Sequence, residues 1–106
     1  MKRIEILPGD YVVSINGEDC QTKSELLKEI AEKLSFPKFF GANWSALEDL
    51  LNDLGWLSSY SRVVMVVNSS RLCLSKEHGQ MSVFKDILAL AEENNSNEVK
   101  FAFLLL

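Results

Sequence analysis

The sequence has few of the residues from which catalytic and metal sites are built. Its 106 residues include one histidine, His78, and two cysteines, Cys20 and Cys73. The cysteines have neither CxxC nor metal-site spacing, which favours reduced thiols in a cytoplasmic protein. His78 lies in a polar stretch with no partner for catalysis evident, which favours an exposed loop residue over a general base. Phosphate-binding glycine motifs and the motif G-x-S-x-G are also absent. We therefore expect neither an enzyme nor a protein that carries a metal or another cofactor.

Long apolar runs and an excess of basic residues are also missing. The longest apolar runs, Val63–Val67 and Phe101–Leu106, are far shorter than the about 20 residues that a helix needs to span a bilayer. The first ten residues, MKRIEILPGD, lack the apolar segment of a signal peptide, so we expect no membrane association. Fifteen acidic against eleven basic residues give a net charge of −4, which disfavours a nucleic-acid partner and is compatible with a basic protein partner.

Strand and helix patterns alternate along a chain of single-domain length. We predict strands at 11–15, 62–68 and 99–105, and helices at 23–34, 44–54 and 80–93. Thr22 and Glu25 form a capping box before the first helix, and Asn43 and Gly55 are suited to cap the second. The run VVMVV at 63–67 is typical of a strand covered on both faces. The order predicts an α/β fold, a small three-stranded parallel sheet packed against three to four helices.

The second predicted helix has an acidic outer face. On a helical wheel its apolar stripe lies almost opposite Asp49, so Asp49 should face solvent. The neighbouring side chains on this face are Ser45, Glu48, Asn52 and Asp53. From residue 39 to residue 61 there are three acids and no base, so this surface should be electronegative.

Two aromatic residues, Phe39 and Phe40, come directly before this helix. Gly41 follows them and permits a tight turn or the close approach of another backbone, and Asn43 is the expected N-cap. Aromatic side chains beside acids are typical of anchors in protein interfaces. The plainer alternative is a solvated helix face with one or both phenylalanines in the core.

The segment P-x-[aromatic]-[aromatic]-G-x-N-x-x-A-L-x-D-x-L occupies residues 37–51. INGE at 15–18, the capped helix after it, the later helix with Asp86 and the apolar C-terminal strand follow the same order as in a known family. Together these features resemble the barstar family, intracellular inhibitors of a secreted ribonuclease. The resemblance covers residues 11–106, which we expect to form the barstar-like domain, with residues 1–10 as an N-terminal arm.

The resemblance implies inhibition of a ribonuclease by occupation of its active site. In this family the second helix and the loop before it take the place of RNA, and acidic side chains mimic phosphates. The implied partner is a basic extracellular-type ribonuclease or nuclease toxin, bound by a monomer without cofactor. The implied contact residues are Phe39, Phe40, Gly41, Asn43, Ser45, Glu48, Asp49, Asp53 and Asp86. The alternative is a non-inhibitory protein-interaction module, or an immunity protein against a different toxin.

The sequence departs from the family pattern at several contact positions. Phe39 and Phe40 stand where tyrosine is typical, and they lack its hydroxyl. Ser45 replaces a second interface acid, and Glu48 replaces a tryptophan. Asp86 is one methylene shorter than the glutamate expected on the later helix. Because these residues are implied contacts, the differences bear on which nuclease the chain binds and not on the mode of binding.

Overall fold

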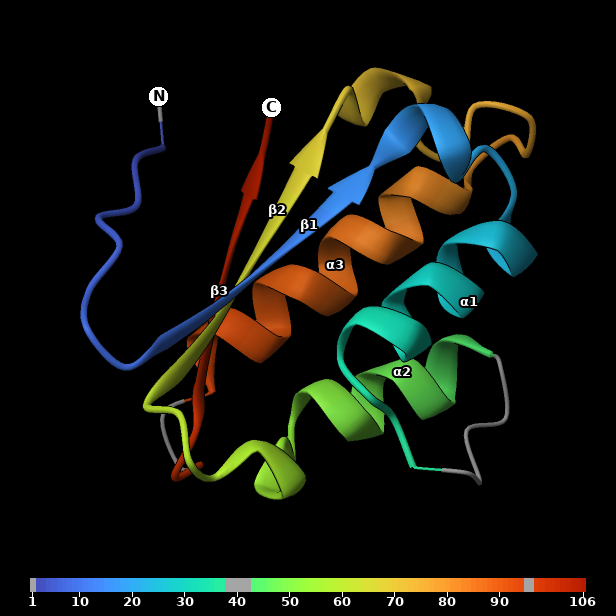
Figure 1. Ribbon diagram of the computed structural model, residues 1–106. Helices are drawn as coiled ribbons and strands as arrows, with labels where there is room; N and C mark the ends of the chain where they lie inside the picture. Colours follow the sequence, from blue (N-terminus) through green and yellow to red (C-terminus); the bar gives the residue numbers. More distant parts are fainter. Residues whose placement is uncertain (1, 38–42, 95–96) are drawn as a thin grey trace.

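The computed structural model describes residues 2–37, 43–94 and 97–106 and shows a parallel sheet with helices (Figure 1). The strands are β1 (Asp10–Asn16), β2 (Arg62–Asn68) and β3 (Lys100–Leu105), and the α-helices are α1 (Lys23–Lys33), α2 (Trp44–Leu51) and α3 (Gln80–Glu93). Short 3-10 helices follow β1, α2 and β2, at η1 (Gly17–Asp19), η2 (Gly55–Leu57) and η3 (Ser70–Leu72). The strands pair in the order β1-β2-β3, all parallel. The predicted α/β fold with a three-stranded parallel sheet is confirmed.

The three α-helices lie on one side of the sheet (Figure 1). Val13, Met65 and Phe103 lie in register across the three strands and pack into the helix-facing core. The next row, on the opposite face, contains Val12, which is 44% exposed. Within the described ranges, no helix is long and apolar enough to cross a membrane.

The central strand β2 is buried more completely than one layer of helices explains. Val63, Met65 and Val67 face the core cluster and are buried. Val64 is also fully buried, although its side chain points to the side away from the α-helices. In the sheet it lies between Val12 of β1 and Ala102 of β3. The apolar run therefore reflects a central position in the sheet rather than two helical layers.

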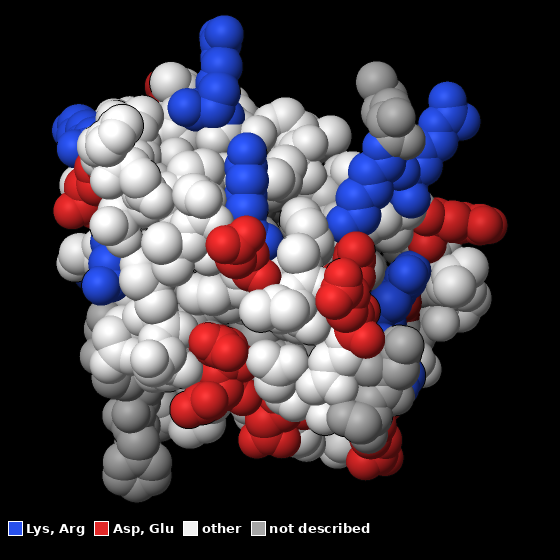
Figure 2. Space-filling view, turned by 180° about the vertical axis from the view of Figure 1, so that it is seen from behind, with Lys and Arg blue, Asp and Glu red and all other residues white. Residues whose placement is uncertain are grey.

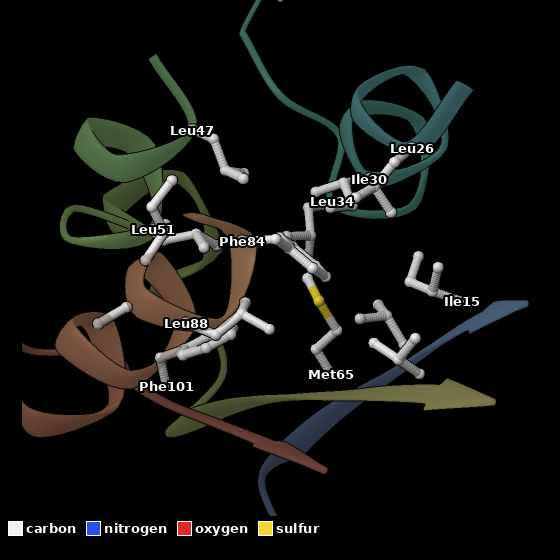
Figure 3. Close-up of a cluster of buried hydrophobic side chains, with 14 of the residues drawn as sticks. Ile15, Leu26, Ile30, Leu34, Leu47, Leu51, Met65, Phe84, Leu88 and Phe101 are labelled. Atoms are coloured by element: carbon white, nitrogen blue, oxygen red, sulfur yellow. The ribbon is translucent and has the colours of Figure 1, made fainter. Parts of the chain in front are cut away.

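The core joins all three α-helices to the sheet (Figure 3). Met65 extends from β2 toward Phe84 of α3 and the side chains of α1. The largest fully or almost fully buried side chains from the helices and from the C-cap of α1 are Leu26, Leu27, Ile30, Leu34, Leu47, Leu51, Phe84 and Leu88. Burying one such side chain contributes roughly 1.5–3 kcal/mol relative to its exposure. The positions of the helices on the sheet are therefore set mainly by these contacts.

The predicted start of α1 is confirmed and the predicted end of α2 is wrong. Thr22 Oγ1 accepts a hydrogen bond from the Glu25 backbone N–H at 3.2 Å, and Glu25 Oε1 accepts one from the Thr22 N–H at 3.1 Å. Helix α2 ends at Leu51 instead of Leu54. Leu54, and not Gly55, takes the left-handed conformation, with φ 55°. The fully buried side chain of Leu54 offsets the backbone strain of that conformation.

The N-terminal residues 2–9 run beside the sheet and are attached to it (Figure 1). Lys2 Nζ lies 2.8 Å from Glu92 Oε2 and 3.4 Å from the centre of the Phe103 ring. At the other end of the segment, the Gly9 carbonyl accepts a hydrogen bond from the Ser61 N–H at 2.9 Å. These contacts connect the segment with α3, β3 and the start of β2.

Asp10 and Arg62 form a cross-strand ion pair where β1 and β2 begin. Arg62 donates from Nε to Asp10 Oδ1 at 3.0 Å and from NH2 to Oδ2 at 2.6 Å. The Leu7 N–H also donates to Asp10 Oδ2, at 2.8 Å. Hydrogen bonding from Arg62, and then from Leu7, lowers the pKa of Asp10 below its ordinary value. The carboxylate therefore stabilises the folded state in its charged form.

We expect Asp10→Asn to lower the free energy of unfolding near neutral pH. Because the folded-state pKa lies below the ordinary 3.8, the stabilisation is present above that pH and is lost as the pH falls through the folded pKa. Urea unfolding between pH 7 and pH 3 should show a wild-type advantage that is largest near neutral pH and shrinks on acidification. Asp19→Asn, which changes an exposed carboxylate, serves as the control. A difference that is independent of pH would contradict this role of the Asp10 charge.

Candidate functional site

Helix α2 and the turn after it place three carboxylates, those of Glu48, Asp49 and Asp53, on the molecular surface at one end of the fold. Leu47 and Leu51 are 0% and 1% exposed and fix the buried side of the helix. Asp49 lies between them in sequence and projects to the opposite side. The side chains of Ser45, Glu48, Asp49 and Asp53 are all exposed. The exposure predicted for these four residues is confirmed; the fifth predicted neighbour, Asn52, is only half-exposed.

The surface around α2 is electronegative. No lysine or arginine occurs from residue 43 to residue 61. Figure 2 shows mainly Asp and Glu in the lower part of the visible face and most of the Lys and Arg in its upper part. Because this view is turned about the vertical axis, the acidic part lies at the height of α2 and η2 in Figure 1. A cationic partner is therefore attracted to the α2 end of the molecule.

The N-terminus of α2 is held against α3. Asn43 Oδ1 accepts a hydrogen bond from the Ala46 N–H at 2.8 Å, which confirms the predicted N-cap. Trp44 Nε1 donates to Gln80 Oε1 at 2.7 Å, and its ring stacks on Phe84 with centroids 6.0 Å apart. These contacts fix the direction in which α2 leaves the preceding loop. The side chain of Asn43, one of the implied contact residues, therefore has a structural role as the cap.

The C-terminus of α2 is held by an asparagine cluster that sequence analysis did not identify. Asn52 Nδ2 donates to the Glu48 carbonyl at 2.8 Å, and Asn94 Nδ2 donates to Asn52 Oδ1 at 2.9 Å. Asn97 Nδ2 also donates to the Asn52 carbonyl. From the sequence alone, the asparagine-rich segment at 94–97 predicts only a turn. Its pairing with the end of α2 depends on the parallel arrangement of α2 and α3.

Helix α3 adds a further acid and exposed apolar surface beside α2. The two helices contact each other at their N-terminal and C-terminal ends, so they run side by side in the same direction. Asp86 is exposed and projects away from the buried Phe84 and Leu88. Val83 and Leu90, three residues before and four after it, are 38% and 55% exposed. Sequence analysis missed these two apolar residues, although they lie outside the buried stripe of α3.

Three of the implied contact residues, Phe39, Phe40 and Gly41, lie outside the described residues. The chain just before them is anchored by Phe36 and Trp56. Their rings meet edge to face with centroids 5.7 Å apart, and Trp56 Nε1 donates to the Leu34 carbonyl at 2.9 Å. The packing of η2 against the end of α1 therefore positions the chain that enters this segment.

The described residues do not form a metal or thiol site. They contain no group of three or more His, Cys, Asp or Glu side chains that could hold a metal ion. Cys20 and Cys73 are free and buried. Burial, followed by the charge of Cys73, raises the pKa of Cys20 to about 12, and burial raises the pKa of Cys73 to about 11. Both thiols are therefore protonated at neutral pH and are weak nucleophiles. His78 is exposed, as predicted.

Comparison with known proteins identifies a family for almost the whole chain. Residues 11–106 match the family described as Barstar (barnase inhibitor). A search of curated proteins gave no match. The matched range contains α1, α2, α3, β2 and β3 in full and all but the first residue of β1. The chain therefore belongs to the barstar family.

Proposed function

We propose that this chain inhibits a basic ribonuclease by inserting the outer face of α2 into the cationic active site of the enzyme. The observation that carries the proposal is the exposed Asp49, which lies on a helix tethered at both ends in a segment without basic residues. The family, described as that of a barnase inhibitor, supports the proposal. We further propose that the inhibitor acts inside the cell as a monomer without cofactor.

The charge and rigidity of α2 suit it to this role. A ribonuclease must stabilise phosphate charge, so its active site contains cationic side chains. A carboxylate that enters such a site forms charge-assisted hydrogen bonds, often bidentate with arginine. Because Trp44 and Asn52 attach both ends of α2 to α3, little conformational freedom is lost when the helix binds.

Other residues of this surface have different proposed roles. Glu48 and Asp53 flank Asp49 and would mainly accelerate encounter with a basic partner. Ser45 is exposed one turn before Asp49 and would contact the partner without adding charge. Asp86, with the exposed Val83 and Leu90 around it, extends the same surface onto α3. Phe39, Phe40 and Gly41 precede the cap in sequence and are proposed to contact the rim of the enzyme.

We expect Asp49→Ala to weaken inhibition most among single substitutions on α2. The truncation leaves partner cations buried without their counter-charge, which costs about 3–5 kcal/mol for a buried pair. The assay titrates the purified chain into RNA cleavage by barnase and by other small basic ribonucleases. Thermal melts should show that Asp49→Ala changes stability by less than about 0.5 kcal/mol, because the side chain is exposed.

Glu32→Ala is the matched control because it removes one exposed carboxylate that belongs to α1 and not to α2. It should leave inhibition near wild type. Asp49→Ala that inhibits normally would contradict the proposal. RNA cleavage by the purified chain itself, lost in Asp49→Ala, would instead indicate an enzyme. Binding without inhibition would support an interaction module.

We expect the double substitution Glu48→Gln and Asp53→Asn to slow association several-fold at low salt and to change the dissociation rate little. Exposed charges around an interface act mainly on encounter, and salt screens them. Asp53→Asn retains an oxygen that can accept the Gly55 N–H, to which the carboxylate is bonded at 3.2 Å. Stopped-flow association at low and high salt measures the effect. A loss that persists at high salt would show that these side chains bind the partner directly.

We expect Asn43→Ala to lower the free energy of unfolding by about 1 kcal/mol through loss of the N-cap and to weaken inhibition through a less ordered α2. Asn43→Ser keeps an oxygen that can cap the helix and should retain most of both properties. Urea unfolding and inhibition titrations of the two variants separate the alternatives. If both variants fold like wild type and both inhibit poorly, Asn43 contacts the partner directly.

A further inference from the structure

A hollow with a partly polar lining lies away from the acidic α2 surface, at the upper end of the molecule in Figure 1. It is a hollow of about 460 Å³ between η3, the loop that follows it, the first turns of α3 and the end of β3. Its volume falls within the range of about 300–1,000 Å³ that small-molecule sites occupy. The hollow lies beyond the carboxyl ends of β2 and β3, which is the side on which open α/β sheets bind ligands.

The hollow is cationic although the chain as a whole is acidic. Two cations, Arg71 and Lys85, line it together with one acid, Glu77, and the imidazole of His78. One oxygen of the Glu77 carboxylate accepts a hydrogen bond from the Lys23 backbone N–H at the start of α1, and the two cations outnumber this single acid. Among the described residues, neither Arg71 nor Lys85 forms an ion pair. By contrast, Lys2 and Arg62 are paired with carboxylates.

The rest of the lining has two kinds of side chain. Ser70 and Ser75 add hydroxyl groups that can donate to an anion or accept from a ligand. Leu74, Met81 and Leu105 provide apolar surface. The lining therefore combines cations and hydroxyls for a charged group with apolar side chains for an organic group.

We propose that this hollow binds a small phosphate ester, with Arg71 and Lys85 contacting the phosphate. The planar guanidinium of arginine matches two phosphate oxygens at once, and lysine supplies a point charge. The apolar side chains then pack against the organic part of the ligand. This site is distinct from the proposed nuclease-binding surface, because its lining contains no residue of α2 and none of Val83, Asp86 and Leu90 on α3.

The test uses the full chain and three named probes: inorganic phosphate, adenosine 5′-monophosphate and adenosine. Backbone amide shifts are followed by NMR at constant ionic strength, with chloride replaced by the probe. We expect saturable shifts at residues 70–85 with both phosphates, tighter binding of the monophosphate ester, and no saturation with adenosine. The double variant Arg71→Ala and Lys85→Ala should raise the apparent Kd at least tenfold.

The matched control is the double variant Arg3→Ala and Lys28→Ala, which changes the net charge equally at exposed positions outside the hollow. It should bind both phosphates like wild type, as should Asp49→Ala. The proposal is overturned if the phosphates give no saturable shift at 70–85, or if the two double variants lose affinity equally. Equal affinity for phosphate and its ester would overturn the assignment of an ester. Because all four substituted residues are exposed, thermal melts should match wild type.

Discussion

Packing of the three α-helices on one face of the sheet is the constraint on which the rest of the structure depends. Each strand contributes alternate residues to this face, and Met65 at its centre points toward Phe84 (Figure 3). Once Leu47 and Leu51 enter the same core, the opposite side of α2 has to face solvent. The position of Asp49 is thus a consequence of burying the leucines, and the acidic surface needs no separate element to orient it.

Polar contacts between the ends of α2 and α3 hold the two helices in place and so define the surface that they form. Gln80 accepts from the Trp44 indole at one end, and Asn94 donates to Asn52 at the other. A helix of eight residues has little intrinsic stability in water, because so few hydrogen bonds follow a costly nucleation step. Its order comes from these neighbours, so residues outside the acidic face of α2 help to determine the shape of that face.

Charge is distributed unevenly over the fold. Asp49 and its neighbours belong to a segment without bases, whereas Arg71 and Lys85 line a hollow beyond the carboxyl ends of β2 and β3. The net charge of −4 does not reveal this separation, because it sums an acidic surface and a basic one. Interaction with a small anion and with a basic protein is therefore compatible with one molecule, since different elements carry the two surfaces.

The sequence by itself determined the elements and the acidic face of α2, because apolar periodicity and capping residues such as Thr22 and Asn43 act over a few residues. It also indicated the parallel sheet, because strands that alternate with helices are joined by crossover connections. It did not determine where α2 ends, because the burial of Leu54 in the core favours a left-handed backbone at that residue over continued helix. The hydrogen bond from Asn94 to Asn52 and the hollow between η3 and α3 were also decided only by the tertiary structure. Each joins segments far apart in the chain, and local patterns carry no information about such contacts.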